Sequence, residues 1–577
     1  MSKPVRDALI REILDRCAGK TALCGENEVL GVGRYRAEDL SCGALFSPCR
    51  LGPLALGNRC AILPLGRVGG ADSPDEAASR FYLARSGAAL LSTEPIPASK
   101  KDDPFPALRW LPLNERMHAR GARMLLQIAL DGSTPAQTAN LAVAAPAGGF
   151  DGVCLNAREN DTGLLETVRE IRARRGASLP ILCRVSLSPA LAESGLLPAG
   201  GRTVPCLAER LEAMTALARA GVDGFELSLG GQEAPWLLTP GSRFPAGCYA
   251  EAARALKAHF RCLGIGAAVL AYGRLGYPAL DEKLLRQSLC DMVSLDGAGI
   301  DDPDWVEKAR RGCGEDICPL PSGAPNVKPG AARVAVVGAG ERGLRYAIAA
   351  ADRGMQVDLY EEKDRLGGTL ARYASQTAYE KQNQLDYLLR ELGKRPSIRV
   401  RRGTRADAEL LKREGYDRIA LGCRAAAVRA PSVPGWGEIP FADAERISEP
   451  LSGAWKKKKV AVIGSGTLAC DLAWALLEKK LARRVSLITE RPLPMPDESA
   501  ADREHFRHFF PQRGGEIVSG CTLLRMRRHS LVYRDARSGK EVHLPCDRIV
   551  LLEEAPASLR LYREAVAERI APEIVLL

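Results

Sequence analysis

The sequence contains two glycine motifs, each placed between an apolar segment and a helical segment. The first has the pattern G-x-G-x-x-G at Gly338, Gly340 and Gly343, with a strand expected over 334–337 and a helix over 344–353. Glycines at this spacing allow a tight turn and let the backbone approach a pyrophosphate, whose charge then lies at the helix N-terminus. The next expected strand, 356–360, ends at Glu361, and a carboxylate there can hold a ribose hydroxyl pair. We expect a nucleotide at this motif; the alternative is a domain that keeps its glycines for packing alone.

The second motif has the pattern G-x-G-x-x-A at Gly464, Gly466 and Ala469. A strand is expected before it over 460–463, a helix after it over 468–479, and a further strand over 485–488. That further strand leads into Glu490 and Arg491. Glu490 favours NADH because it can bind a ribose hydroxyl, whereas Arg491 favours NADPH because it can meet a 2′-phosphate. The motif therefore predicts an NAD(P)H site and leaves the choice between the two cofactors open.

Upstream of both motifs, short apolar segments alternate with helical stretches such as 205–220 and 248–260. Eight strands at this spacing, separated by helices, predict a (β/α)8 barrel of about 280 residues. The predicted strands are 60–65, 89–94, 124–130, 152–156, 181–186, 224–229, 266–272 and 292–296.

These patterns predict an α/β protein with four parts. The first is an extension over 1–43, in which residues 4–20 have the apolar spacing of an amphipathic helix suited to packing on the next domain or a partner chain. A barrel domain follows over 44–325, and its end is rich in Pro and Gly, as in a linker. An FAD- or ADP-type Rossmann-like domain is expected over 332–450, completed by about 565–577, with a nested NAD(P)-type domain over 456–560.

Composition and charge narrow the class of protein. No apolar run approaches the roughly 20 residues that a membrane-spanning helix needs. Residues 4–20 carry Asp7, Glu12 and Asp15, which fits neither a secretory signal nor a transit peptide, so we expect a cytoplasmic protein. The formal net charge of +11, from 81 Lys and Arg against 70 Asp and Glu, is mild over 577 residues. An anionic small molecule explains it as well as a nucleic acid does.

Two further features are interpreted as structural. The lysine run 456–459 is interpreted as a solvated surface rather than a nucleic-acid site, because no aromatic residues accompany it. The 17 cysteines include no C-x2-C pair, and we interpret them as reduced, mostly buried thiols, with a metal or cluster site as the minority alternative. We therefore expect no metal.

Several segments resemble the old yellow enzyme-like NADH:flavin oxidoreductases, in the branch of 2,4-dienoyl-CoA reductase and trimethylamine dehydrogenase. The resemblance covers about residues 44–577. Its carriers are LFSPCRLGPLALGNRCAILP from Leu45, FDGV from Phe150, DPDWVEKA from Asp302, EEKDRLGG from Glu361 and YDRIALGCRAAAVRAPSVPG from Tyr416.

The resemblance implies a barrel with FMN and an iron–sulfur cluster, and a second domain with FAD or ADP. In the reductases of this family, NAD(P)H reduces FAD and electrons pass through the cluster to FMN and the substrate. Gln127 matches the glutamine that contacts the flavin pyrimidine edge, and Arg184 matches the basic residue near flavin N1. Gly273 and Arg274 match the phosphate loop after strand seven. The segment from Glu361 places Gly367 and Gly368 with the first nucleotide site.

The barrel departs from the family pattern at its catalytic and phosphate-binding positions. A histidine expected three residues after Gln127 is replaced by Leu130, and Asn156 and Glu159 stand where the family has a His-x-x-His or His-x-x-Asn pair. An ionised Glu159 would repel a developing enolate. In the second phosphate loop, the family's Gly-Arg is replaced by Asp296-Gly297. These changes weaken the expectation of FMN on the barrel and leave the catalytic residues unknown.

Two more departures concern the other cofactors. The cluster's cysteine run is reduced here to Cys318 followed by PLPSGA, so a 4Fe–4S cluster is not expected. Family members end on a strand running into Gly-Asp, which holds the ribityl half of FAD, whereas the last strand here is expected over 573–577. We therefore expect the ADP half of the ligand to be held best.

Three hypotheses follow. The first is a homologue with eroded barrel sites, a pseudoenzyme that serves a redox assembly as a nucleotide-binding partner or structural subunit, or as part of an oligomer. The second is an active NAD(P)H-dependent flavin (FAD/FMN) oxidoreductase with an unknown acceptor or an enoate or enoyl substrate. The third, a nucleic-acid-binding protein, is supported by net charge alone, and we expect neither nucleic acid nor membrane as partner.

Overall fold

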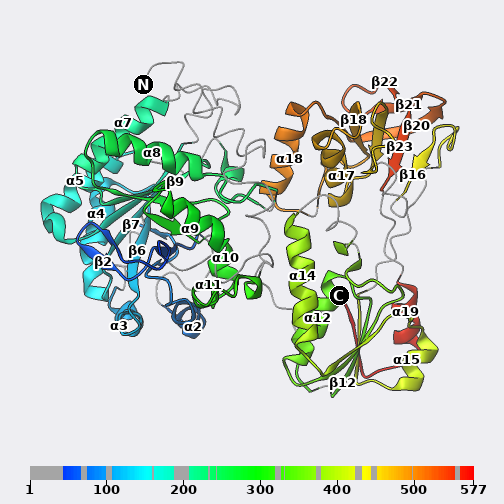
Figure 1. Cartoon of the computed structure of the whole chain (residues 1–577), viewed down its shortest axis with the longest axis horizontal. Coiled ribbons are helices and arrows are strands. Elements are labelled where there is room, and N and C mark those ends of the chain that lie inside the picture. Colours follow the sequence, from blue (N-terminus) through cyan, green and yellow to red (C-terminus); the bar gives the residue numbers. More distant parts are fainter. Residues whose placement is uncertain are drawn as a thin grey trace. The chain divides into compact units, whose positions relative to one another are not determined.

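The structure is a computed structural model of the whole chain, and its contacts divide the chain into two compact units, Met1–Pro321 and Ser322–Leu577 (Figure 1). The predicted N-terminal helix over 4–20 lies outside the described residues. The described residues are 43–65, 74–98, 107–130, 132–158, 162–187, 207–231, 234–241, 243–295, 297–318, 327–330, 332–368, 370–371, 379–422, 432–443, 451–496, 498–552 and 559–577.

The first unit contains a closed barrel of eight parallel strands. Neighbouring strands follow the chain order, and pairing between the second and third strands and between the first and eighth closes the ring. All eight predicted strands are present, so the predicted barrel is confirmed. The strands are β3 (Cys60–Ile62), β4 (Leu90–Ser92), β6 (Arg123–Ala129), β7 (Gly152–Ala157), β8 (Ile181–Ser186), β9 (Gly224–Ser228), β10 (Ala268–Ala271) and β11 (Met292–Ser294).

Helices surround this barrel, as Figure 1 shows for the blue-to-green part of the chain. Some begin with clear local signals: in α4, Thr134 and Gln137 form a reciprocal capping box and Pro135 takes the first helical position. The helices are α2 (Glu76–Ala84), α3 (Leu111–His118), α4 (Pro135–Ala144), α5 (Leu164–Arg175), α7 (Leu207–Arg219), α8 (Ala250–Cys262), α9 (Pro278–Arg286), α10 (Gly297–Asp301) and α11 (Trp305–Arg310).

A short hairpin, β1 (Cys49–Leu51) and β2 (Leu54–Leu56), joins the apolar core of the barrel, and a two-residue strand, β5 (Ile96–Pro97), extends the pairing of β6. Leu125 and Leu182 belong to that core. Since side chains two residues apart on a strand share a face, Gln127 and Arg184 lie on the same inner face, one layer farther toward the carboxyl ends of the strands. A polar layer therefore lies above an apolar one inside the barrel.

The second unit contains two separate parallel sheets, each starting from a glycine motif. The first has the order β14-β13-β12-β15-β24, so the last strand of the chain completes the sheet that the first glycine motif begins. Both faces of these apolar strands are buried, as is typical of parallel sheets. The elements are β12 (Arg333–Val337), α12 (Glu341–Ala351), β13 (Gln356–Tyr360), α14 (Tyr379–Gly393), β14 (Ile398–Arg401), α15 (Ala408–Glu414), β15 (Arg418–Leu421), α19 (Arg560–Ala567) and β24 (Glu573–Leu576).

The second sheet has the order β16-β23-β17-β18-β19 and is accompanied by an antiparallel sheet β20-β21-β22. Two apolar clusters, one on each side of the parallel sheet's strands, form its core. Both sheets confirm the predicted Rossmann-like class. The elements are β16 (Phe441–Ala442), β17 (Lys459–Ile463), α17 (Thr467–Glu478), β18 (Arg484–Thr489), α18 (Ala500–Gln512), β19 (Glu516–Ser519), β20 (Cys521–Arg527), β21 (Ser530–Asp535), β22 (Glu541–Pro545) and β23 (Arg548–Leu551).

Candidate functional site

The first glycine motif forms a tight turn between β12 and α12. Gly338 has φ +95°, a conformation that favours glycine, and its amide donates to the carbonyl of Tyr360 at 2.8 Å. A Cβ at Gly343 would lie 1.9 Å from the Gly338 carbonyl oxygen, so the helix packs directly against the turn. A Cβ at Gly340 would meet no atom within 4 Å. Gly340 therefore faces open space at the helix N-terminus, where a phosphate can approach.

Glu361 and the Gly367-Gly368 pair lie at this same turn. The Glu361 Oε2 accepts a hydrogen bond from the backbone amide of Ala339 at 2.9 Å, and its Oε1 accepts one from the backbone amide of Lys363 at 3.1 Å. Gly367 forms an isolated parallel bridge with Gly340, and a Cβ at Gly368 would lie 3.1 Å from the Gly340 Cα. Each carboxylate oxygen keeps a second lone pair for a ribose hydroxyl. The residues present at this turn fit the ADP half of a dinucleotide.

The second motif forms the corresponding turn between β17 and α17. A Cβ at Gly464 would lie 3.0 Å from the Cβ of Ala469, and Gly466 is the N-cap of α17, with no side chain to block the helix end. Glu490 and Arg491 lie just past β18, and both are exposed. The residues fit a dinucleotide here, and nothing in the geometry chooses between a ribose hydroxyl and a 2′-phosphate.

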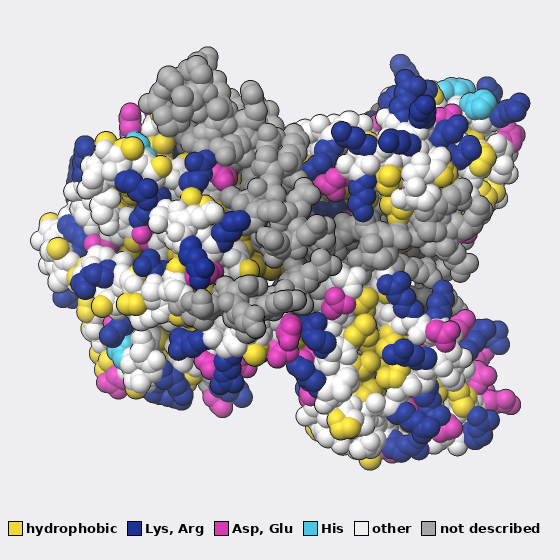
Figure 2. Space-filling view, viewed as in Figure 1, with side chains coloured by type: hydrophobic (Ala, Val, Ile, Leu, Met, Phe, Trp, Pro, Cys, Tyr) yellow, Lys and Arg dark blue, Asp and Glu magenta, His cyan; other side chains and the backbone are white. Residues whose placement is uncertain are grey.

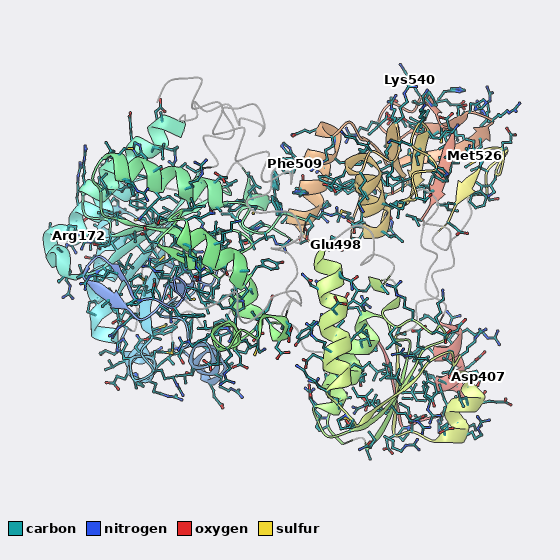
Figure 3. All side chains as sticks on the ribbon, in the orientation of Figure 1. Arg172, Asp407, Glu498, Phe509, Met526 and Lys540 are labelled. Carbon is teal, nitrogen blue, oxygen red and sulfur yellow. The ribbon has the colours of Figure 1, made fainter. Side chains whose placement is uncertain are left out.

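The chain that follows β18 returns to this second turn, which the sequence did not predict. The Met495 amide donates to the Ser465 carbonyl at 2.6 Å, and the Thr467 hydroxyl donates to Glu498 Oε1 at 2.6 Å (Figure 3 labels Glu498). A carboxylate is favourable at a helix N-terminus, and Glu498 takes this place at α17. No motif in the sequence marks Glu498, which stands two residues before the helix α18.

Inside the barrel, Gln127 and Arg184 form a fully buried network with Glu226. Arg184 and Glu226 are register partners on β8 and β9, and Arg184 Nε donates to Glu226 Oε1 at 2.7 Å. Arg184 Nη1 donates to Gln127 Oε1 at 2.7 Å. The Gln127 amide nitrogen donates to the carbonyls of Pro64 and Thr93, each at 2.8 Å. The pair that the resemblance assigns to a flavin is therefore brought together, but its groups are bonded to protein atoms.

A second arginine completes the network. Arg158 Nη2 forms an ion pair with Glu226 Oε1, and the Arg158 guanidinium lies 4.2 Å from the ring centroid of Tyr272. Burial alone would raise the pKa of the Glu226 carboxyl, but Arg184 and Arg158 hold that pKa below its usual range. The side chains of Arg184, Arg158 and Glu226 are at most 1% exposed. Among the described residues, this network therefore buries two cations and one anion, an excess of one positive charge.

Other predicted barrel residues lie around this network. Asn156 is the register partner of Arg184 on β7, and its Oδ1 accepts from the Arg158 amide at 3.5 Å. Leu130 is buried just beyond the end of β6. Glu159 and Asp296 lie outside the described residues.

The predicted phosphate loop after β10 is packed against the protein. A Cβ at Gly273 would lie 2.7 Å from the ring of Tyr249. The Arg274 Nη1 donates to the carbonyls of Gly241 and Phe244 at 3.1 and 2.8 Å. Its Nη2 lies 3.3 Å from the hydroxyl of Tyr277. The arginine that would meet a flavin phosphate thus holds the loop between β9 and α8.

In the part of the chain that the structure describes, no group of three or more His, Cys, Asp and Glu side chains is placed to hold a metal ion. Cys313 and Cys318 are half-buried. Within the same residues, no helix has both the length and the apolar character needed to cross a bilayer.

Comparison with known proteins agrees with this architecture. Residues 336–398 match the family of NAD(P)-binding Rossmann-like domains, and residues 407–552 match the pyridine nucleotide-disulphide oxidoreductase family. The chain is 29% identical to an NADH oxidase of Thermoanaerobacter brockii, over 55% of this chain and 51% of the oxidase. It is 27% identical to a bilirubin reductase of Mediterraneibacter gnavus, over 50% of this chain and 49% of the reductase. These alignments span about half the length of each relative.

A solved structure extends the comparison to nearly the whole chain. A 2-naphthoyl-CoA reductase in complex with 2-naphthoyl-CoA superposes with a TM-score of 0.71 at 17% identity, over 92% of this chain and 96% of that one. The resemblance to the old yellow enzyme-like flavoenzymes is thereby confirmed for the fold, and the sequence matches relate the chain to NAD(P)- and flavin-linked oxidoreductases.

Proposed function

We propose that this chain, which has the fold of the old yellow enzyme-like flavoenzymes, is a nucleotide-binding subunit of a redox assembly. In this proposal the first glycine turn binds ADP or FAD, the second binds NAD(P)H, and the barrel takes part as a scaffold without FMN. The observation that carries it is the contrast between the open first glycine turn and the closed polar network in the barrel.

The first turn supports nucleotide binding because its groups are already in place. Gly340 faces open space at the start of α12, and Glu361 is fixed at the turn by its bond to the Ala339 amide. Backbone amides at a helix N-terminus favour a pyrophosphate, and the carboxylate favours a ribose. Bound FAD would supply a two-electron carrier at this domain.

The barrel interior argues against FMN in the observed arrangement. The Gln127 amide and the Arg184 Nε and Nη1 atoms are bonded to protein acceptors, and Glu226 introduces a negative charge beside them. Arg274 likewise is bonded to the carbonyls of Gly241 and Phe244. A ligand would have to break these bonds, and freeing a buried charge from its partner costs about 3–5 kcal/mol.

A second candidate function is an active NAD(P)H-dependent flavin oxidoreductase. One atom favours it: Arg184 Nη2 is buried and has no hydrogen-bond partner among the described residues. A ligand oxygen in the barrel would satisfy it. The names of the sequence relatives, an NADH oxidase and a bilirubin reductase, favour the same activity. The acceptor would be unknown, with enoates and enoyl thioesters as the substrate classes to try.

The absorption spectrum of the purified protein separates the two functions. The nucleotide-binding subunit is expected to be colourless, or to lack FMN when its cofactor is released and chromatographed, and to bind ADP. A yellow protein that bleaches under argon when NADH or NADPH is added, and that releases FMN, would contradict that proposal and support the oxidoreductase. A colourless protein that binds ADP would contradict the oxidoreductase.

A further inference from the structure

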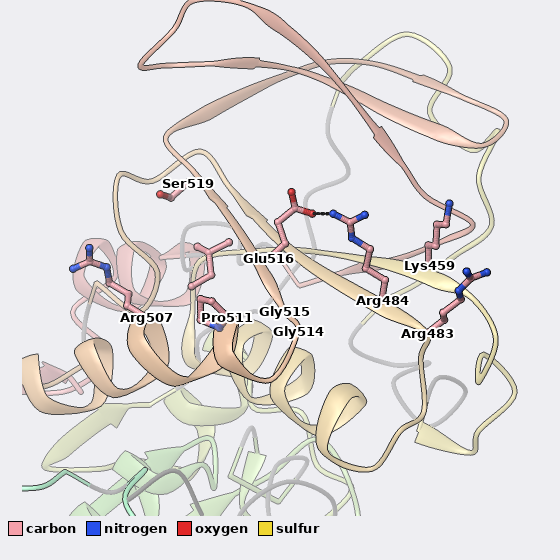
Figure 4. Close-up of a pocket in the computed structure, with 10 residues that line it drawn as sticks. Lys459, Arg483, Arg484, Arg507, Pro511, Gly514, Gly515, Glu516 and Ser519 are labelled. Carbon is pink, nitrogen blue, oxygen red and sulfur yellow. Dashed lines mark hydrogen bonds and ion pairs between the residues drawn. The ribbon is translucent and has the colours of Figure 1, made fainter. Parts of the chain in front are cut away.

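A basic groove runs along the amino-terminal edge of the second nucleotide sheet (Figure 4). Its volume is about 840 Å³. The groove is formed by the starts of β17 and β18, by β19, by the second half of α18 and by the turn after that helix. Its lining residues are Lys459, Arg483, Arg484, Arg507, Pro511, Gly514, Gly515, Glu516, Ile517 and Ser519.

The groove holds more positive charge than the protein neutralises. Among the described residues of its lining, Glu516 is the one carboxylate, and it pairs with Arg484 at 3.2 Å. Arg507 pairs with Glu504, which lies outside the lining, at 2.7 Å. Neither Lys459 nor Arg483 has an ion-pair partner among the described residues. Three exposed lysines, residues 456–458, lead into the groove. Figure 2 shows Lys and Arg side chains gathered over the visible face of the part of the chain that contains the second nucleotide sheet.

The sheet register brings these charges together. Lys459 and Arg484 are register partners on adjacent parallel strands, and such strands lie about 4.8 Å apart. Their side chains therefore project from the same face of the sheet. Arg484 is paired with Glu516, so Lys459 beside it is left without a counter-charge among the described residues, and an anion in the groove would supply one.

This groove is separate from the NAD(P)-type turn. The glycine motif at Gly464 follows the carboxyl end of β17, whereas Lys459 begins the same strand at its amino end. The dinucleotide therefore does not account for the basic charge.

The lining indicates which anion the groove suits. The amides of Gly514 and Gly515 are already bonded to the carbonyls of Pro511 and Phe510, so they form no cradle for a phosphate. None of the described residues that line the groove is aromatic, which argues against stacking of nucleic-acid bases. Pro511 and Ile517 add apolar surface beside the cations. The cations are distributed along the groove beside apolar residues, and these two glycine amides are not free to bind a phosphate. Such a surface fits an extended peptide that carries several carboxylates.

We propose that this groove is a docking site for an acidic segment of a partner protein. Lys459 and Arg483 meet the carboxylates of the segment, and Ile517 and Pro511 contact its apolar residues. Complementary charge of this kind steers encounter and selects the partner, and its strength falls with salt. The inference does not depend on which nucleotide the chain binds.

The test measures binding of a fluorescein-labelled peptide of Glu residues with a central Leu pair, by anisotropy with the full chain. The groove variant is Lys459→Gln with Arg483→Gln, which removes two charges without breaking an ion pair. The matched control is Arg402→Gln with Lys540→Gln, two exposed cations outside the groove (Figure 3 labels Lys540). Circular dichroism melts confirm that both variants fold.

The wild type and the control are expected to bind the peptide equally, with an affinity that falls between 50 and 300 mM salt. The groove variant is expected to bind at least tenfold more weakly. Failure of the wild type to bind, or equal weakening in both variants, would overturn the proposal. So would competition by inorganic phosphate or by an oligothymidylate at lower concentration than by unlabelled peptide, since these would indicate a phosphate or nucleic-acid site.

Discussion

Arg184 and Glu226 face each other across neighbouring strands inside the barrel, with Arg184 Nε 2.7 Å from Glu226 Oε1 and both side chains fully buried. The pair lies at the level where Gln127 would meet a ligand, and Arg158 binds the same carboxylate. Glu226 is thus the single anion between two buried cations. In the function proposed above, this carboxylate both stabilises the barrel and keeps FMN out of it.

Replacing Glu226 by Gln is expected to destabilise the protein by about 3–5 kcal/mol, because two buried guanidinium groups lose their counter-charge. The free energy of unfolding is measured by urea titration with a barrel-specific probe. The control is Glu307→Gln, which removes an exposed ion pair with Arg311 and is expected to cost less than about 1 kcal/mol. Equal effects of the two substitutions would show that the buried network is not maintained in solution.

The buried Asp281 carboxyl leads us to predict that stability falls as pH rises. This carboxyl is fully buried, and burial raises its pKa well above the usual range, although the amide of Gly276 donates to it. A raised pKa in the folded state means that its contribution to stability is complete below about pH 4 and is lost as pH rises through the folded-state value. Asp281→Asn cannot ionise, so its advantage in urea midpoint over the wild type is expected to grow with pH. Midpoints that stay parallel across pH 4–8 would contradict the prediction.

Two glycines of the first turn are expected to separate packing from binding. Gly343→Ala places a Cβ 1.9 Å from the Gly338 carbonyl, so we expect both a lower melting temperature and loss of ADP binding. Gly340→Ala meets no protein atom within 4 Å and has φ −74°, so the melting temperature is expected to hold while ADP binding weakens. Calorimetric titration with ADP and thermal melts check both. If Gly340→Ala bound ADP normally, the phosphate would lie elsewhere.

Glu361→Ala is expected to weaken ADP binding about 10- to 100-fold, because a hydrogen bond to a charged group contributes about 1.5–3 kcal/mol. Glu362→Ala, a change at the exposed neighbouring carboxylate, serves as the control and is expected to bind ADP normally. An unchanged affinity in Glu361→Ala would show that the ribose contact is misplaced.

The regular parts of the fold were predictable because their signals are local. Eight apolar strands and two glycine turns each stand within a short stretch of chain, and Gly338 and Glu361 follow from the strand–turn–helix pattern. Glu226 was missed, although a lone acid between Phe225 and Leu227 in a buried strand is a signal of a paired interior charge.

The basic groove had no such local signal. Lys459 and Arg484 become neighbours only through the register of β17 and β18, and Arg507 joins them from α18. The lysine run 456–459 was interpreted as a solvated surface, since the sequence alone does not show which other cations fold against it.

The pairing of β15 with β24 also sets an order of events during synthesis. Arg418 and Glu573, an ion pair across these strands, are 155 residues apart. The ribosome synthesises the chain from its amino end. One edge of β15 therefore stays unpaired until β24 is made, while the nested domain emerges and folds. Bare strand edges invite pairing with other chains. Pairing of β24 with β15 thus ends the period in which newly made chains can associate through the β15 edge. Proteolytic removal of β24 would expose that edge again.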